Sequence, residues 1–296
     1  MGATRAETQA ETQAAHRDFE IRPLGAHTGA EVIGLDLRKP VGAAAKAAIE
    51  AALVEYCCLV FPEQHLTPQE YAEAAGLFGE VRTQNFSKYA LPDLPTVNAV
   101  SNAHPGADGQ RAYHASYWHT DFPNFERPPD YTILYAVTMP KEGGETGVAN
   151  MRAAFEALPE ETRERLAGLK AFTVRRAGSV DQSRMKTLAD EDPEFLKKSV
   201  IQPLVRTHPV SGTKALYFHK GKVEYLLGMA PKESRELLED LVENAIRPEF
   251  VYKHKWRVGD MLVIDNRASM HRGYPNYDLN QDRLLYRIIV GADEAF

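Results

Sequence analysis

The stretch Trp118-His119-Thr120-Asp121 is the part of the sequence around which the rest of the chain makes chemical sense. His119 and Asp121 are two residues apart, and in a strand such residues point to the same face. An imidazole and a carboxylate that converge there supply two of the three ligands of a 2-His-1-carboxylate site, which holds non-heme Fe(II) and leaves positions open. Since a lone His-x-Asp pair also occurs by chance on protein surfaces, the interpretation requires a second histidine and an acid-binding group further along the chain.

The second histidine is expected in the block Asp265–Gly273, which follows the apolar run Met261–Ile264. His271 lies in this block, where a rigid strand beside the core could hold a ligand. Any single histidine here can equally be a hydrogen-bonding residue of the surface or core. Spacing alone does not separate His271 from three other histidines of this half of the chain: His208, His219 and His254.

Two arginines sharpen this choice. Arg283 and Arg287 lie in the run 283–290, which is too apolar for a surface loop. In a strand they would share one face, roughly 13 Å apart at about 3.3 Å per residue. Arginine is seldom buried without an anion, because removing an unpaired charge from water is costly. The pattern therefore predicts two bound carboxylates, one for each arginine, and the alternative is a pair of buried ion pairs with Asp or Glu.

Composition limits the class of protein. The chain has 296 residues, of which 44% are hydrophobic and 26% charged, as in an ordinary globular protein. The net charge of −6 and the lack of a basic run argue against a nucleic-acid partner. No apolar run is long enough to span a membrane, and the N-terminus lacks the order of a signal peptide. With Cys57 and Cys58 adjacent and expected to be reduced, a cytoplasmic location is predicted.

Hydrophobic periodicity and turn residues predict the elements of the fold. Helices are expected at 43–57, 67–78 (with a capping box at Thr67), from Asn150, at 159–168 and at 231–246. Strands are expected at 19–24, 30–37, 59–61, 131–137, 249–256, 261–265 and 283–290.

The domain organisation follows from what lies between these elements. Residues 1–17 are polar and Ala-rich and are expected to form a disordered tail, whereas residues 18–296 are expected to form one domain. Residues 82–117 show no clear period and are expected to include loops that form the substrate pocket. Residues 178–202 are polar and weakly patterned, which is typical of a lid or of partial disorder.

The order of these motifs resembles that of the TauD/TfdA (taurine dioxygenase) family of Fe(II)- and 2-oxoglutarate-dependent dioxygenases. The resemblance runs from about residue 19 to 292. It rests on five segments together: Trp118–Asp121, Gly143–Thr146, His208–Gly212 with Ala215–Tyr217, Asp265–Gly273, and Arg283 with Arg287. It implies a mainly β (α+β) fold, a double-stranded β-helix or jelly-roll core with flanking helices.

The resemblance also implies roles for individual residues. His119, Asp121 and His271 match the iron ligands. Thr146 and Arg283 match the residues that bind 2-oxoglutarate, although Glu145 stands where the family usually has Asp. Arg287 matches the arginine that meets the acidic group of the substrate.

Other substrate-side residues are less sharply indicated. Tyr113 and His114, in the loop before the metal motif, are candidates for substrate binding. His208 is expected to order its turn and not to bind metal. Core packing is expected for three aromatic residues that could also line a pocket: Tyr89, Phe218 and Trp256.

The predicted activity is oxidation, by hydroxylation, of an unactivated C–H bond of a small anionic substrate. Fe(II), 2-oxoglutarate and O2 are the expected cofactors, and succinate and CO2 the expected by-products. Desaturation or another oxidative rearrangement of a small amino-acid-like metabolite is an alternative outcome. A zinc-dependent cupin-type hydrolase or isomerase could use the same three metal ligands but would not need Thr146 and Arg283. A homo-oligomer is compatible with the sequence.

Overall fold

The computed structural model describes residues 19–83, 88–106, 108–174 and 199–291. The tail expected at 1–17 lies outside these residues, and so does most of the segment 178–202. Residues 199–202, at the end of that segment, belong to a strand and not to a loop.

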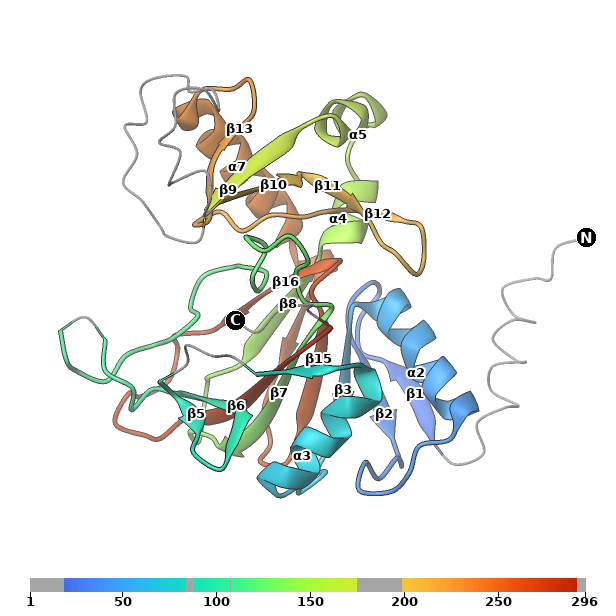
Figure 1. The fold of residues 1–296 in the computed structure, drawn as a ribbon, viewed down its shortest axis with the longest axis vertical. Coiled ribbons are helices and arrows are strands. Elements are labelled where there is room, and N and C mark those ends of the chain that lie inside the picture. The colour runs from blue at the N-terminus through green and yellow to red at the C-terminus, as the bar shows by residue number, and fades with distance from the viewer. Residues whose placement is uncertain (1–18, 84–87, 107, 175–198, 292–296) are drawn as a thin grey trace, which may run out of the picture.

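A large sheet forms the centre of the fold (Figure 1). All its strand pairs are antiparallel except β2 with β3. In spatial order its strands are β1 (Glu20–Pro23), β2 (Ala30–Ile33), β3 (Cys58–Phe61), β15 (Met261–Asp265), β7 (Tyr131–Thr138), β17 (Leu284–Val290), β6 (Leu94–Ser101) and β5 (Ala90–Leu91), and β4 (Val81–Arg82) pairs with β17.

A smaller antiparallel sheet faces the large one. Its strands are, in order, β14 (Val251–His254), β8 (Thr146–Asn150) and β16 (Ser269–Gly273). Val148 of β8 packs in one buried cluster with Leu134, Ile264 and Leu285 of the large sheet. The layer between the two sheets is therefore dry, and the side chains that enter it come from strands far apart in the sequence.

The opposite face of the large sheet is covered by helices α2 (Ala43–Tyr56) and α3 (Pro68–Ala75), followed by the 3-10 turn η1 (Gly76–Phe78). Val263 packs on this helical side and Ile264 on the inner side. Because both faces of β15 are buried, its sequence is a continuous apolar run with no alternation. The capping box at Thr67 is confirmed, since the Glu70 N–H donates to the Thr67 hydroxyl.

The remaining elements gather at one end of the two sheets (Figure 1). They pack around a separate hydrophobic cluster. They are α4 (Met151–Glu156), α5 (Glu160–Ala167), β9 (Lys170–Val174), β10 (Ser199–Pro203), β11 (Val205–Thr207), β12 (Lys214–Leu216), β13 (Val223–Leu226), α7 (Pro231–Ala245) and η3 (Pro248–Phe250). Strands β10, β9 and β13 form one sheet, and β11 with β12 forms a hairpin.

The expected mixture of sheet and flanking helices, with sheet predominant, is confirmed. Residues 82–117, in which no strand was predicted, contain the eight-residue strand β6. The strand expected at 249–256 is shorter, since its first residues form η3. None of the helices in the described part of the chain has the length and apolar character needed to cross a membrane.

Candidate active site

His119 and His271 are brought together by their own backbones. The His119 N–H donates to the His271 carbonyl at 3.0 Å, and the His271 N–H donates back to the His119 carbonyl at 2.7 Å. The sequence had suggested that His119 lies in a regular strand. It lies instead in an isolated antiparallel bridge beside β16. The reciprocal pairing places the two imidazole rings with centroids 4.3 Å apart.

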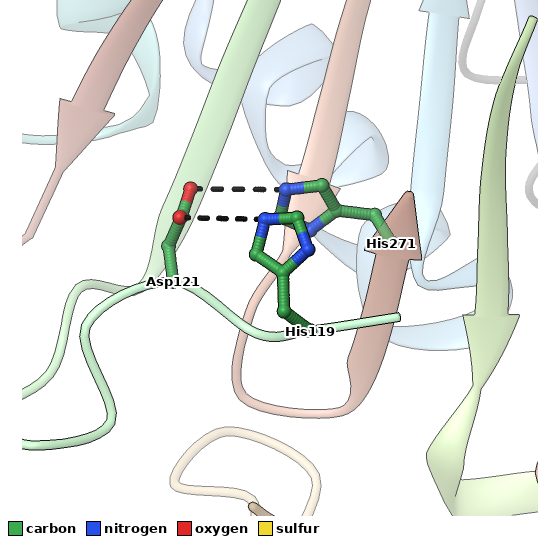
Figure 2. Close-up of side chains that lie close together, drawn as sticks. All are labelled: His119, Asp121 and His271. Carbon is green, nitrogen blue, oxygen red and sulfur yellow. Dashed lines mark ion pairs between the residues drawn. The ribbon is translucent and has the colours of Figure 1, made fainter. Parts of the chain in front are cut away.

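Asp121 faces both rings (Figure 2). Its Oδ1 lies 3.9 Å from His119 Nε2, and its Oδ2 lies 3.8 Å from His271 Nε2. These distances are too long for hydrogen bonds, although all three side chains are buried. Among the described residues, His119, Asp121 and His271 are the group whose donor atoms converge closely enough to hold one metal ion.

A chain of hydrogen bonds that the sequence did not reveal orients Asp121. The Thr132 hydroxyl donates to Asp121 Oδ2 at 2.7 Å, and the Asn266 amide donates to the Thr132 hydroxyl at 2.8 Å. The Thr120 hydroxyl donates to the Asn266 carbonyl at 3.0 Å. Such outer partners fix the orientation of a metal ligand.

The protonation of the site suits metal binding. His119 Nδ1 lies 2.8 Å from the Tyr117 carbonyl, which can only accept, so Nδ1 carries the proton and Nε2 has a free lone pair. Burial lowers the pKa of His271 to about 3, and the nearby His119 adds to this effect. Burial alone would raise the pKa of Asp121, but the charge of Arg287 and the hydrogen bond from Thr132 hold it well below its usual range. The site thus presents two neutral imidazoles and one carboxylate.

Arg287 reaches this group from β17. Its Nη1 lies 3.8 Å from Asp121 Oδ1, and its guanidinium carbon lies 5.7 Å from the centre of the Phe122 ring. Its side chain is 24% exposed, so water or a ligand can reach it. One of the two predicted arginines therefore contacts a protein carboxylate, at a distance too long for a direct hydrogen bond.

Arg283 is placed differently. It lies just before β17, is buried, and donates from Nε to the Gly144 carbonyl at 3.0 Å. It forms no ion pair with an Asp or Glu in the described part of the chain, and burial lowers its pKa. Gly144 has a φ of +74°, and a Cβ there would lie 3.1 Å from Arg283 Nε, so only glycine fits this approach. A buried guanidinium without an acid is the feature that the sequence predicts for an anion site.

Thr146 lies two residues beyond Gly144, at the start of β8, and is buried. Its hydroxyl accepts a hydrogen bond from the Trp256 indole at 3.0 Å. In the register of the small sheet, Thr146 pairs with Gly273 and Val148 pairs with His271. Thr146 and His271 therefore share the face that looks toward the large sheet, which places the anion site beside the metal group.

The two other candidate residues use their polar atoms elsewhere. The Tyr113 hydroxyl donates to the Tyr277 carbonyl at 2.6 Å, and His114 Nε2 lies 2.9 Å from the His104 carbonyl. These bonds fasten the loop before the metal motif, and a substrate role for either residue stays a prediction.

His208 is confirmed as an ordering residue. Its Nδ1 accepts the N–H groups of Val210 and Ser211, so the proton on Nε2 faces Asp265 Oδ2 at 3.0 Å. Arg267 donates to the same carboxylate. The cluster fastens the β11–β12 hairpin to the end of β15. Phe218 is likewise a core residue, as expected.

Two further polar residues lie at the site: His219, which spacing had left as a candidate beside His271, and Asn98, which sequence reasoning missed. His219 is buried beside the metal group, with its ring centroid 5.8 Å from that of His119, and its Nδ1 accepts the Gly221 N–H at 3.0 Å. Asn98 of β6 pairs in register with Arg287, and neither polar atom of its buried amide has a hydrogen-bond partner within the described residues. The only signal for Asn98 was an amide that interrupts an otherwise strand-like run, LPTVNAVS.

Comparison with known families gives a match along most of the chain. Residues 20–289 match the family model described as taurine catabolism dioxygenase TauD, TfdA family.

Individual relatives are similar over nearly their full length. The (S)-phenoxypropionate/alpha-ketoglutarate-dioxygenase of Sphingobium herbicidovorans is 31% identical over 286 residues, covering 94% of this chain and 96% of that protein. The alpha-ketoglutarate-dependent 2,4-dichlorophenoxyacetate dioxygenase of Cupriavidus pinatubonensis is 33% identical over 288 residues, covering 90% and 95%. The crystal structure of AAD-2 in complex with Mn(II) and N-oxalylglycine has a TM-score of 0.75 and 34% identity, covering 94% of this chain and 98% of that one.

Proposed function

The chain belongs to the TauD/TfdA family of dioxygenases, and from this premise we propose that it hydroxylates an unactivated C–H bond of a small anionic organic compound. The protein is an oxidoreductase that depends on 2-oxoglutarate (alpha-ketoglutarate) and uses Fe(II) and O2. What the proposal adds is the type of reaction, the charge of the substrate and the roles of individual residues.

The observation that carries the proposal is the convergence of His119, Asp121 and His271 beside a buried arginine that lacks an acid. The donor set fits Fe(II): two neutral imidazoles and one carboxylate are the ligands of the facial triad, whereas structural zinc prefers four protein ligands. In this assignment the three side chains hold the iron. The bound metal and keto acid supply the oxidising chemistry, in which 2-oxoglutarate and O2 are consumed, succinate and CO2 are released, and one oxygen atom enters the substrate.

Arg283 and Thr146 are assigned to 2-oxoglutarate. A planar guanidinium suits a carboxylate, and the desolvated Arg283 forms no ion pair among the described residues. Thr146 adds a hydroxyl on the same side of the small sheet as His271. The distal carboxylate of the keto acid would therefore be bound here, with its other end directed to the metal group.

Arg287 is assigned to the prime substrate. Its side chain is partly exposed beside the metal group, where an incoming anion can reach it. The two relatives named above are called after phenoxypropionate and 2,4-dichlorophenoxyacetate, both of which carry a carboxylate. A guanidinium beside the metal group would hold such an acid with its carbon chain near the oxidising centre.

The architecture is consistent with this assignment. We interpret the two facing sheets as a double-stranded β-helix (jelly roll), and residues 18–296 as one domain. The buried free thiols of Cys57 and Cys58 support a cytoplasmic location. Membership in the dioxygenase family replaces the alternative of a zinc-dependent hydrolase or isomerase.

The proposal is tested by anaerobic loading of the purified protein with Fe(II) and 2-oxoglutarate, followed by addition of O2 with single acids. The probes are 2,4-dichlorophenoxyacetate, (S)-2-phenoxypropionate and an alkyl sulfate, each beside an uncharged analogue. Acids should stimulate succinate release, whereas uncharged analogues should not. The products taken together should contain one added oxygen atom: where the hydroxylated carbon bears the ether or sulfate oxygen, the hydroxylated compound separates into a phenol or sulfate and a carbonyl compound. Loss of two hydrogens would instead indicate desaturation, and equal stimulation by charged and uncharged compounds would overturn the anionic substrate.

A further inference from the structure

Trp256 makes one polar contact that bears directly on the anion site. Its indole Nε1–H donates to the Thr146 hydroxyl at 3.0 Å, across 110 residues of sequence. An indole N–H can only donate, so in this bond Thr146 can only accept. The bond therefore decides which way the hydroxyl proton of Thr146 points.

The hydroxyl proton has no acceptor in the part of the chain that the structure describes. Thr146 is 2% exposed, and its one side-chain hydrogen bond is the one it accepts. A buried O–H without an acceptor is costly unless a ligand supplies one. Arg283, whose Nε donates to the carbonyl of Gly144, two residues before Thr146, likewise forms no ion pair with an acid among the described residues. Both groups are hydrogen-bond donors awaiting an acceptor.

The position of Trp256 is fixed by buried neighbours. His254 pairs in register with Thr146, and the His254 ring meets the Trp256 ring edge-on, with centroids 4.5 Å apart. Asp260, which is fully buried, lies 3.2 Å from His254 Nε2 and accepts the backbone N–H of Arg257 at 3.0 Å. The residue after Trp256 and the ring beside it are thus tied to one carboxylate, so the indole is held in place in the absence of ligand.

We propose that Trp256 is a positioning residue for 2-oxoglutarate. Its indole N–H donates to the oxygen of the Thr146 hydroxyl. The hydroxyl proton is therefore left to donate to the distal carboxylate that Arg283 binds. Without the indole, the hydroxyl is free to rotate and present its lone pairs to the carboxylate, which repels them. This inference rests on the proposed assignment of Thr146 and Arg283 to 2-oxoglutarate.

A double-mutant cycle tests the proposal with 2-oxoglutarate as the probe. Its affinity is measured calorimetrically, without O2, for the Fe(II)-loaded wild type, Trp256→Phe, Thr146→Val and the double variant. Because Trp256→Phe loses a single neutral hydrogen bond, it should bind 2-oxoglutarate about threefold to tenfold more weakly than the wild type. Thr146→Val should weaken binding by about tenfold or more, because it removes a bond to a charged group. The double variant should match Thr146→Val, since Trp256 acts only through the hydroxyl.

The outcomes separate this inference from the proposed function. Wild type that does not bind 2-oxoglutarate overturns both. Thr146→Val that weakens binding while Trp256→Phe does not, or losses that add in the double variant, overturn the role of Trp256 alone.

A second measurement does not depend on how well Trp256→Phe folds. The chain has two tryptophans, so the variant Trp118→Phe assigns both indole N–H signals in the NMR spectrum of the Zn(II)-loaded protein. The Trp256 signal should shift when 2-oxoglutarate is added to Zn(II)-loaded protein with Trp256 intact, and saturating 2-oxoglutarate should shift it less in Thr146→Val. An unmoved Trp256 signal in protein that binds 2-oxoglutarate would contradict the proposal.

Discussion

The two ends of the layer between the sheets differ in how their charges are balanced. At one end, which we call the metal end, Asp121 lies near two neutral imidazoles and Arg287. At the other, the acid end, the buried Arg283 has no ion pair within the described residues and Thr146 has a hydroxyl proton with no acceptor there. The three metal ligands, Thr146 and Arg283 are all buried, whereas Arg287 is partly exposed.

This difference indicates what each end lacks. The metal end holds one negative and one positive charge and has its donor atoms too far apart to bond one another, so it is completed by a cation between them. The acid end holds a buried positive charge that forms no ion pair among the described residues, which is costly away from water, so it is completed by an anion. The two requirements together describe a metal ion and an acid bound side by side.

The largest expected effect is at the metal end. His119→Ala, Asp121→Ala or His271→Ala should each abolish turnover, because the metal loses one of three ligands, while the protein stays folded. Succinate release and bound iron are measured after anaerobic reconstitution. Thr132→Val, which removes only the hydrogen bond to Asp121, should cost about 10- to 100-fold in metal affinity or activity. Near-wild-type activity of any of the three alanine variants would remove that residue from the ligand set.

At the acid end, Arg283→Ala should weaken 2-oxoglutarate binding by about 2–5 kcal/mol, because a desolvated charge-assisted pair is lost. This corresponds to roughly 30-fold or more in affinity. Arg283→Lys is the matched variant: it keeps the charge but loses the planar fork, and should recover only part of the binding. An unchanged affinity in Arg283→Ala would move the acid site elsewhere, with Arg287 as the first candidate.

Arg287→Gln tests whether the metal end and the acid end bind different ligands. It should weaken binding of the prime substrate by about 1.5–3 kcal/mol, the range for a hydrogen bond to a charged group, while the affinity for 2-oxoglutarate stays the same. Titration of 2-oxoglutarate into the anaerobic Fe(II)-loaded variant, monitored by the absorbance of the complex, is the measurement. If 2-oxoglutarate binding weakens in parallel with activity, Arg287 belongs to the co-substrate and the division between the ends is wrong.

The metal end should also respond to pH when the metal is removed. Folded His271 has a pKa of about 3 because burial disfavours its charge, whereas the unfolded value is 6.5. Between these values the unfolded chain binds the extra proton, so stability is lost as pH falls, by up to about 1.4 kcal/mol per pH unit for one histidine. Urea unfolding of the metal-free protein at pH 5 and 7 measures this slope. His271→Asn should reduce the slope without removing it, because burial also lowers the pKa of His219, to about 4. An equal slope in that variant would contradict the assignment.

Of the metal end, His119 and Asp121 were predictable from sequence because their chemistry is local, whereas His271 was assigned through the resemblance and not through its spacing. His119 and Asp121 are neighbours in the chain, and His271 follows an apolar run whose two faces are both buried. The histidines His208 and His219 could not be distinguished by spacing. Their difference depends on hairpin geometry, which turns one toward Asp265 and the other toward His119.

The hydrogen bonds that orient these residues could not be predicted. Thr132 reaches Asn266 across 134 residues, and Trp256 reaches Thr146 across 110. No periodicity encodes such contacts, because they depend on the register between strands. Strand β6 was missed for a related reason: Asn98 places an amide in the buried layer, which breaks the apolar pattern that identifies a strand.

The smallest expected effect compares two buried asparagines, one beside each arginine. Asn102 donates to the carbonyls of Leu279 and Gln281 and accepts the N–H of Arg283, whereas the Asn98 amide, opposite Arg287, has no partner among the described residues. Replacing an amide without partners by a similar apolar shape removes a desolvation cost, so Asn98→Leu should raise the free energy of unfolding by about 1 kcal/mol. Asn102→Leu, the matched control, should lower the free energy of unfolding by about 1–3 kcal/mol, because this variant leaves several backbone groups without a hydrogen-bond partner. Urea unfolding of the ligand-free protein measures both. Destabilisation by Asn98→Leu would mean that its amide is already satisfied, and that the end of the layer beside Arg287 is as complete without ligand as the surroundings of Asn102.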